Sequence, residues 1–273
     1  MRPTLFQKET ARGYQPDEMS QWFLSDADDV KGVILIIHGL NQKPSKWMDM
    51  IQFLNTKNFH VFRLTLKGHG GARFKDMMQV DADTWLEDID AATTEIQQKF
   101  PKAKKILMAY SLGALSALEY QLKTGKQVFQ KQLLLAPAIR LKDYVFLVKP
   151  LIRIFPSIPS RSPEEYRANP FRTASAAYQA MFSLLNDFSH RDGFSHINSD
   201  TLVLMRTSDE LVSYAGIKDW IETTGMTRWQ IKEIPDAQSG PGRQFRHLIL
   251  DQDSFGQKGW TYVKKQIEAL LLD

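Results

Sequence analysis

The sequence predicts an α/β fold with a mostly parallel central sheet, helices on both faces and an inserted helical lid. Short apolar runs typical of buried parallel strands recur along the chain, with helical segments between them. These runs are Val33 to Ile37, Val61 to Leu66, Ile106 to Ala109, Leu133 to Leu135 and Leu202 to Met205. Strands that alternate with helices in this way indicate a parallel sheet that is covered on both sides.

The segments between the runs place their large apolar residues on one face of a helix. The first set is Trp47, Met50, Ile51 and Leu54, the second is Trp85, Ile89, Ala92, Ile96 and Phe100, and the last is Trp260, Val263, Ile267, Leu270 and Leu271. A capping box, Thr84-x-x-Glu87, predicts the start of the second helix. The first 30 residues lack this pattern, and we expect antiparallel edge strands there, around Gln21 to Leu24.

One stretch interrupts the alternation. From about Ala138 to Ser199 no strand-like run arrives where the pattern requires one, and Ala174 to Phe188 has helical spacing. We interpret residues 138–199 as an inserted lid (cap) of short helices within a single domain that spans residues 1–273. Because ligands bind beyond the carboxyl ends of the strands in open α/β sheets, this lid is expected to roof the site.

The composition is that of an ordinary soluble globular protein, with 273 residues, 43% hydrophobic and 24% charged, and a formal net charge of +4. Basic residues are scattered, which argues against nucleic acid as a partner. The absence of cysteine excludes disulfides, thiolate catalysis and zinc–cysteine sites. Residues Met1 to Lys8 lack the apolar core of a secretory signal, and no stretch reaches the ~18 apolar residues of a spanning helix. We expect a cytoplasmic protein that uses no cofactor and no metal.

Residues 106 to 118 run from a short apolar strand through Ser111 into a helix of small residues. That layout holds a nucleophilic hydroxyl at the top of a sheet, and its usual pattern is G-x-S-x-G. Here it reads Ala109-Tyr110-Ser111-Leu112-Gly113, with alanine at a position where the requirement is steric. A serine between small residues can also simply begin a helix, but the strand before and the helix after favour a nucleophile.

A serine nucleophile needs a base, and a third group must orient that base. In this architecture the chain order is Ser, then Asp or Glu, then His. The histidines downstream of Ser111 are His190, His196 and His247. His247 follows the strand candidate Trp229 to Ile234 and precedes the final helix, so we favour it over the two histidines near the end of the lid.

The orienting acid is expected just after a strand. Asp209 lies in the loop that follows Leu202 to Met205, and Glu210 beside it is the immediate rival. An aspartate after a serine is also common in turns and caps. The usual order of the three groups favours Asp209.

An oxyanion needs backbone N–H donors, one just after the nucleophile and one from an earlier strand–helix loop. Leu112 and Leu40 are the candidates. His38 precedes the nucleophile and is expected to hold its loop by hydrogen bonding. We interpret Lys67-Gly68-His69-Gly70-Gly71 as a structural turn, because it lacks the spacing of a phosphate-binding loop.

Four motifs stand in a familiar order: His38-Gly39-Leu40, Gly68-His69-Gly70, Ala109-Tyr110-Ser111-Leu112-Gly113, and the pair Asp209 and His247. With them the chain resembles an α/β-hydrolase, specifically the lysophospholipase and monoacylglycerol-lipase-like group of serine hydrolases. Two departures are Ala109 for the first glycine and Lys67 where an arginine often precedes Gly-His-Gly. The resemblance implies Ser111 as nucleophile, Asp209 as acid, His247 as base, and the amides of Leu40 and Leu112 as the oxyanion hole.

These residues predict a serine carboxylic-ester hydrolase that forms an acyl-enzyme. The expected substrate is a small-molecule acyl ester such as a monoacylglycerol or a lysophospholipid, because the lid is rich in large apolar side chains. The lid residues predicted to contact the acyl chain are Phe146, Leu147, Tyr178 and Phe182, although such residues also pack a lid onto its body.

Two rivals and one further contact stay open. An aminopeptidase-like amide hydrolase of the same fold would need carboxylates for the substrate amine, and Glu164 and Glu165 are the adjacent acidic pair of the lid. A catalytically silent scaffold could instead bind a small hydrophobic ligand. A mildly basic surface also leaves transient contact with a membrane surface open.

Overall fold

The computed structural model describes residues 4 to 71 and 73 to 272, and within them seven strands form one central sheet. The strand order is β1-β3-β2-β4-β5-β8-β9, and β1 pairs antiparallel with β3 while the other pairs are parallel. The strands are β1 (Gln21–Phe23), β2 (Gly32–Ile37), β3 (Phe59–Leu64), β4 (Lys105–Tyr110), β5 (Lys131–Leu135), β8 (Asp200–Met205) and β9 (Trp229–Glu233). The predicted α/β fold with a mostly parallel sheet is therefore confirmed.

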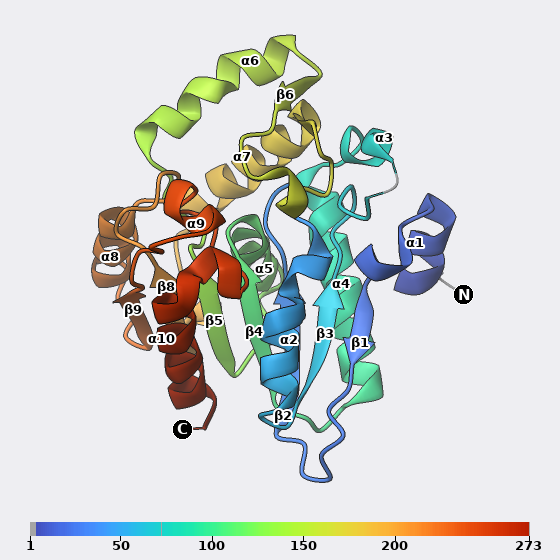
Figure 1. Ribbon diagram of the computed structural model, residues 1–273, viewed down its shortest axis with the longest axis vertical. Coiled ribbons are helices and arrows are strands. Elements are labelled where there is room, and N and C mark those ends of the chain that lie inside the picture. The colour runs from blue at the N-terminus through green and yellow to red at the C-terminus, as the bar shows by residue number, and fades with distance from the viewer. Residues whose placement is uncertain (1–3, 72, 273) are drawn as a thin grey trace.

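Helices cover both faces of this sheet. In Figure 1, α2 and α10 lie in front of the strands, and α4 and α5 lie behind them. The central strands are accordingly buried along nearly their whole length, which explains why they read as continuous apolar runs. The helices are α1 (Leu5–Arg12), α2 (Met48–Asn55), α3 (Phe74–Met77), α4 (Ala82–Lys99), α5 (Leu112–Thr124), α6 (Lys149–Ile154), α7 (Ser175–Ser189), α8 (Tyr214–Thr223), α9 (Pro241–Gln244) and α10 (Gln252–Leu272).

The segment 138–199 follows β5, and its helix α6 lies at the top of Figure 1. Besides α6 and α7 it contains two short strands, β6 (Ser157–Pro159) and β7 (Arg172–Ala174), which pair antiparallel. These strands were not expected, because three residues carry too little periodicity to be recognised. The segment reaches the loop after β2 through a hydrogen bond from Asn169 N–H to Asn41 Oδ1 (2.8 Å).

The N-terminal segment differs from the prediction. Antiparallel edge strands were expected in the first 30 residues, around Gln21 to Leu24, and one such strand is present at Gln21–Phe23. The helix α1 at Leu5–Arg12 was not expected. Thr4 and Gln7 form a reciprocal capping box that fixes the start of α1. Residues 1 to 3, which belong to the segment Met1 to Lys8 that was predicted to lack a secretory signal, lie outside the described residues.

Helix α4 also begins earlier than predicted. Its N-cap is Asp81, whose Oδ1 accepts a hydrogen bond from Thr84 N–H at 2.8 Å. Thr84 was predicted to be the cap itself. An aspartate is at least as good an N-cap as a threonine, so the local sequence offered two starts and the earlier one is used. Within the described residues, no helix combines the length and the apolar character needed to cross a membrane.

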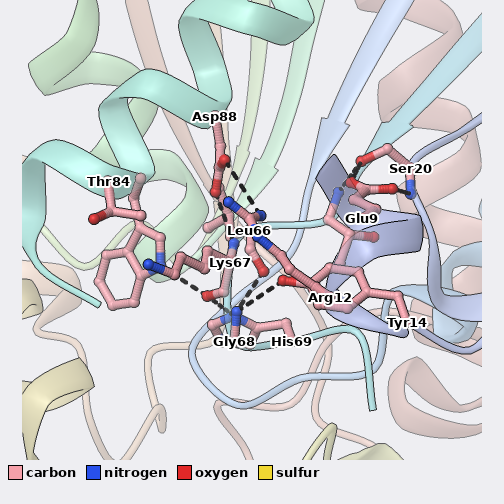
Figure 2. A network of polar contacts seen from close by, with 12 residues as sticks. Glu9, Arg12, Tyr14, Ser20, Leu66, Lys67, Gly68, His69, Thr84 and Asp88 are labelled. Carbon is pink, nitrogen blue, oxygen red and sulfur yellow. Dashed lines mark hydrogen bonds and ion pairs between the residues drawn. The ribbon is translucent and has the colours of Figure 1, made fainter. Parts of the chain in front are cut away.

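Helix α1 is held to the body by the buried carboxylate of Glu9, which accepts hydrogen bonds from the backbone N–H (2.8 Å) and the hydroxyl of Ser20 (Figure 2). Burial raises the pKa of Glu9 to about 7, and the nearby charge of Asp88 adds to the rise. The folded protein therefore binds a proton at Glu9 in the interval between pH 4.5, the ordinary pKa, and about 7, where the unfolded chain does not. Stability from this group is present below that interval and is lost as the pH rises through it.

Replacement of this carboxyl by an amide should flatten the pH dependence. In Glu9→Gln, the decline of unfolding free energy between pH 5 and 8 should shrink by about 1–3 kcal/mol, because the proton linkage is gone. Urea unfolding at several pH values measures this. Glu95→Gln, at a partly buried position on α4, is the control and should keep the wild-type slope. An unchanged slope in Glu9→Gln would show that Glu9 is ionised in both states.

Candidate active site

Ser111 lies at the sharp turn between β4 and α5. Its φ of 51° and ψ of −115° are strained for a residue with a side chain. The turn is tight because α5 passes directly against β2: a Cβ on Gly113 would lie 2.4 Å from the carbonyl oxygen of His38. Ala109 stands inside β4 and is fully buried there, so the alanine at the first small position is accommodated.

The structure brings the three predicted side chains together. His247 Nε2 lies 2.9 Å from Ser111 Oγ, and His247 Nδ1 lies 2.7 Å from Asp209 Oδ2. With a proton on Nδ1, the ring donates to the carboxylate and leaves Nε2 free to accept from the serine hydroxyl. Ser111 keeps 9% of its surface exposed, so its hydroxyl sits at the edge of the buried interior.

The choice between the adjacent acids is resolved by where each side chain points. Asp209 is fully buried, and its Oδ1 accepts hydrogen bonds from the N–H groups of Leu211 (2.7 Å) and Val212 (2.8 Å) while Oδ2 faces the imidazole. Glu210 instead accepts a hydrogen bond from the backbone N–H of His247 at 2.8 Å. Asp209 therefore orients the ring, and Glu210 holds the main chain that carries it.

Neighbouring groups shift the pKa values of both His247 and Asp209. Burial acts to lower the pKa of His247, but the charge and hydrogen bond of Asp209 outweigh it, together with the charge of Glu210, and the pKa is raised. Burial acts to raise the pKa of Asp209, but His247 and two backbone N–H groups reverse this, and the pKa is lowered. Asp209 is thus an anion that stabilises a positive charge on the ring.

Two residues that the sequence analysis did not single out hold the loop of His247. Tyr110 donates from its hydroxyl to the carbonyl oxygen of His247 (3.0 Å). The guanidinium of Arg206 is fully buried and donates to the carbonyl oxygens of Gly242 (3.2 Å), Arg246 (3.0 Å) and Leu248 (3.3 Å). The sequence signal for Arg206 is its position directly after a buried apolar strand. A charge in such a place must be fully paired, so it indicates a structural role.

The loop after β2 lies against the nucleophile. A Cβ on Gly39 would lie 3.4 Å from Ser111 Cβ and 2.6 Å from the Tyr110 ring, so a side chain at this position would prevent the approach. The N–H of Gly39 donates to Gln42 Oε1 at 2.8 Å. Leu40 follows in this loop, and Leu112 is the first residue of α5, where an N–H has no acceptor within the helix. Both predicted oxyanion donors therefore belong to segments that border Ser111.

Two buried histidines fix this loop from below. His38 Nε2 accepts a hydrogen bond from Leu66 N–H (3.0 Å), and its Nδ1 lies 2.8 Å from the carbonyl oxygen of Gly39. His69 Nε2 accepts from Asn41 N–H at 2.9 Å. Burial lowers the pKa of His38 well below its ordinary value and the pKa of His69 to about 4. Both rings are neutral, with the proton on Nδ1, and His38 holds the loop as the sequence suggested.

The turn that carries His69 is itself held by α4 and by the segment after α1 (Figure 2). Asp88 Oδ2 accepts from Lys67 N–H at 2.7 Å, and the hydroxyl oxygen of Tyr14 accepts from Gly68 N–H at 3.1 Å. Burial raises the pKa of Asp88 to about 6, and the hydrogen bond from Lys67 N–H opposes the rise. The N-terminal segment thus supports the loop after β2, which carries Leu40, through the Lys67–His69 turn. We call this loop, residues 39–42, the oxyanion loop for its predicted role.

The remaining candidates lie in the segment 138–199. His190 and His196, the alternatives for the base, are exposed. Phe146 packs on Phe182 with ring centroids 5.6 Å apart, and Tyr178 is half-buried. Leu147 is 74% exposed. Its contact with the acyl chain stays a prediction.

The candidate site combines three side chains with the backbone of two segments. Among the described residues, no group of three or more histidines and carboxylates is arranged to hold a metal ion. What the arrangement offers is a hydroxyl whose proton can pass to an imidazole, an anion that stabilises the imidazolium, and backbone N–H groups beside the hydroxyl. Such a set suits attack on an acyl carbonyl.

Comparisons with known proteins identify a family and a fold for this chain. The family model described as serine aminopeptidase, S33, matches residues 28–238, a range that includes Ser111 and Asp209 and ends before His247. A structure from work on LipS and LipT, two metagenome-derived lipolytic enzymes, is similar with a TM-score of 0.75 and 14% identity over 94% of this chain and 98% of that chain.

Two further structures are monoacylglycerol lipases. A soluble variant of the monoglyceride lipase from Saccharomyces cerevisiae, in complex with a substrate analog, has a TM-score of 0.71 and 15% identity over 92% of this chain and 89% of that chain. The monoacylglycerol lipase of Paleococcus ferrophilus has a TM-score of 0.70 and 19% identity over 92% and 97%. At these identities the likenesses establish the α/β-hydrolase fold.

The close contact of α5 with β2 generates a prediction about Gly113. In Gly113→Ala the new Cβ would meet the backbone oxygens of His38 (2.4 Å) and Ile37 (2.6 Å), so we expect a loss of about 2 kcal/mol or more despite the better helix propensity of alanine. Urea unfolding measures this. Gly193→Ala is the control, because nothing lies within 4 Å of its Cβ position. Equal stability of both variants would show that α5 can move away from β2.

Proposed function

The chain belongs to the serine aminopeptidase, S33, family of α/β-hydrolases, and we propose that within this family it is a serine hydrolase of carboxylic esters. The observation that carries the proposal is the continuous hydrogen-bond path from Ser111 Oγ to His247 Nε2 (2.9 Å) and from His247 Nδ1 to Asp209 Oδ2 (2.7 Å). Each link has the length of an ordinary hydrogen bond, so no rearrangement is needed before proton transfer.

In the proposed acylation step, Ser111 Oγ attacks the carbonyl carbon of the ester while its proton passes to His247 Nε2. Asp209 stabilises the resulting imidazolium, and the backbone N–H groups of Leu40 and Leu112 stabilise the oxyanion of the tetrahedral intermediate. When the intermediate collapses, the carbon–oxygen bond to the leaving alcohol breaks and the imidazolium donates its proton to that oxygen. The acyl group remains as an ester of Ser111.

In the proposed deacylation step, a water molecule takes the place of the alcohol. His247 Nε2 removes a proton from this water, and the oxygen attacks the acyl carbon under the same two N–H donors. Collapse breaks the bond to Ser111 Oγ, which regains its proton from the imidazolium, and the carboxylic acid leaves. The net reaction consumes one water for each ester bond.

The lid supports a substrate with an acyl chain, such as a monoacylglycerol or a lysophospholipid. Phe146 packs on Phe182 and Tyr178 is half-buried, and we propose that these three side chains contact the acyl chain. The outer side carries large exposed apolar side chains, namely Leu147 (74%), Leu151 (45%), Ile154 (74%) and Phe155 (50%). Lys149 and Arg153 lie among them in sequence, which favours transient contact with an anionic lipid surface.

Amide cleavage is the second candidate, because the matching family model describes an aminopeptidase and because an acidic hollow lies beside the lid. This hollow has a volume of about 760 Å³, and its lining includes Asp17, Glu18, Glu164 and Glu165, which suit a protonated amine. Lys43 and Arg167 also line it and offset the negative charge. Its lining does not include Ser111, Asp209 or His247, so the esterase proposal has the stronger support.

The proposed roles predict a graded series of activities. Ser111→Ala should abolish both p-nitrophenyl ester hydrolysis and labelling by a fluorophosphonate probe, because the nucleophile is absent. Asp209→Asn should keep the fold but lower kcat by roughly 10⁴-fold, since the ring loses its orienting anion. Steady-state kinetics on p-nitrophenyl esters and on aminoacyl nitroanilides measures both effects and compares the two candidate reactions.

Glu210→Gln is the matched control, because its amide oxygen can still accept from the backbone of His247 and the variant should retain most of its activity. A loss in Glu210→Gln as large as that in Asp209→Asn would reverse the assignment of the acid. Faster turnover of the anilides would favour the aminopeptidase. Equal labelling of wild type and Ser111→Ala, or of neither, would leave a silent ligand-binding scaffold as the best description.

The outer face of the lid generates a separate prediction. The double variant Leu147→Ser, Ile154→Ser should bind anionic phospholipid vesicles roughly tenfold more weakly, because two exposed apolar anchors are lost. Hydrolysis of soluble p-nitrophenyl acetate should stay unchanged. Vesicle sedimentation measures binding, and Phe6→Ser, which removes a 63% exposed phenylalanine from α1, is the control. Equal binding by the double variant and wild type would refute the role of the lid face.

A further inference from the structure

Asn41 follows the proposed oxyanion donor Leu40 and has an unusual conformation. Its φ is 50°, in the left-handed region that few residues other than glycine tolerate, and asparagine is among those few. Its side chain is nevertheless buried, with 4% of the residue exposed. A buried carboxamide needs partners for two donors and one acceptor, and the location of these partners shows what the residue connects.

All of those partners belong to the lid. Asn41 Nδ2 donates to Ser160 Oγ (2.9 Å), to the carbonyl oxygen of Asn169 (3.0 Å) and to Thr173 Oγ1 (3.0 Å). Asn41 Oδ1 accepts from the N–H of Asn169 at 2.8 Å. The carbonyl oxygen of Asn41 accepts from Ala168 N–H at 3.0 Å. One residue thus joins the oxyanion loop to three separate points of the lid, from Ser160 to Thr173.

The remaining polar group of Asn41 faces the body of the protein. Its N–H donates to His69 Nε2 at 2.9 Å, and His69 is fixed because its Nδ1 faces the carbonyl oxygens of Leu66 and Lys67, each at 3.2 Å. The peptide group between Leu40 and Asn41 is therefore held on one side by the turn that carries His69 and on the other side by the lid. Lys43 N–H also reaches the lid, because it donates to the carbonyl oxygen of Tyr166 at 2.8 Å. Since the orientation of Leu40 N–H depends on the residues that follow it, loss of the side-chain contacts of Asn41 would loosen the loop on the side that faces the lid.

We propose that Asn41 is a positioning residue that ties the oxyanion loop to the lid, so that the donor geometry at Leu40 depends on the docked lid segment 160–173. This inference rests on the proposed ester hydrolysis and adds a requirement to it. The lid then has two parts with different tasks. Residues 160–173 complete the oxyanion loop and stay docked, whereas the outer part with Leu147 and Ile154 contacts the lipid.

Asn41→Gly is the sharpest test, because glycine adopts a positive φ without strain and lacks only the carboxamide. We expect kcat for a soluble p-nitrophenyl ester to fall about 10- to 100-fold with KM within about twofold, since a misplaced oxyanion donor affects the transition state and spares substrate binding. Amide hydrogen exchange at residues 39–42 should become roughly tenfold faster. The melting temperature should fall by a few degrees only, because the buried N–H of Asn169 loses its acceptor while the fold is kept.

A lid-side variant and a lid control complete the design. Thr173→Val keeps the shape of the side chain but removes one acceptor for Asn41 Nδ2, so it should shift kcat and exchange at residues 39–42 in the same direction by a smaller factor. Gln179→Ala removes a bond to the carbonyl oxygen of Ile152 (2.9 Å) that does not involve Asn41, and it should change neither quantity.

The outcomes separate the two proposals. If Asn41→Gly matched the wild type in both kcat and exchange at residues 39–42, the positioning role would be wrong. Equal effects of Gln179→Ala and Thr173→Val would also overturn it, because any loosening of the lid would then suffice. A wild type without ester turnover would refute the esterase proposal, and the exchange data would still decide whether Asn41 ties the loop to the lid.

Discussion

The backbone of Ser111 is held in a conformation that residues with side chains avoid, and the surrounding fold serves to keep it there. Strand β4 ends directly before Ser111 and α5 begins directly after it. Both elements are held in place because the end of β2 contacts the first turn of α5. The N–H of Ser111 is satisfied by the carbonyl oxygen of Leu135 (2.9 Å), and its own carbonyl oxygen accepts from Ala138 N–H (3.1 Å). Contacts within the central sheet thus stabilise the strained backbone of Ser111, and this conformation sets the position of its hydroxyl.

Charges around His247 are arranged to favour proton transfer. Two carboxylates, Asp209 and Glu210, contact the residue, and one buried guanidinium, Arg206, lies below its loop. The contacts that Arg206 makes to the loop of His247 are to backbone carbonyl oxygens, so its charge is dispersed over peptide dipoles. Arg206 also forms an ion pair with Asp236 (Nε to Oδ1, 3.8 Å), so three carboxylates stand against one guanidinium. The excess of negative charge agrees with the raised pKa of His247, because Asp209 and Glu210 favour the protonated ring.

Much of this arrangement could be predicted from the sequence, because its signals are local. The apolar run before Ser111 and the small residues after it mark a strand, a turn and a helix, and chain order then narrows the base to His247. The rest depends on contacts between distant segments. Asp209 and Glu210 are neighbours with the same chemistry, and only the turn after β8 decides which carboxylate meets the ring. Asn41 looks like an ordinary loop residue until its partners, up to 132 positions away, are brought into contact. Leu5–Arg12 has few apolar residues, so its helix was missed: a buried glutamate fixes it, and hydropathy does not reveal such a contact.

The sequence separation of the reacting groups has a consequence for the protein while it is being made. Ser111 and His247 lie 136 residues apart, and the base stands in a loop that is shaped by Arg206 and closed by the start of α10. When the strands from β2 to β8 have left the ribosome, Ser111 and the oxyanion loop have already been made. His247, which is the proposed base, has not. In the proposed mechanism, a nascent chain can hydrolyse an ester only after the segment that carries His247 has been made and the start of α10 has docked. The proposed nucleophile therefore lacks its base during most of the synthesis of the chain.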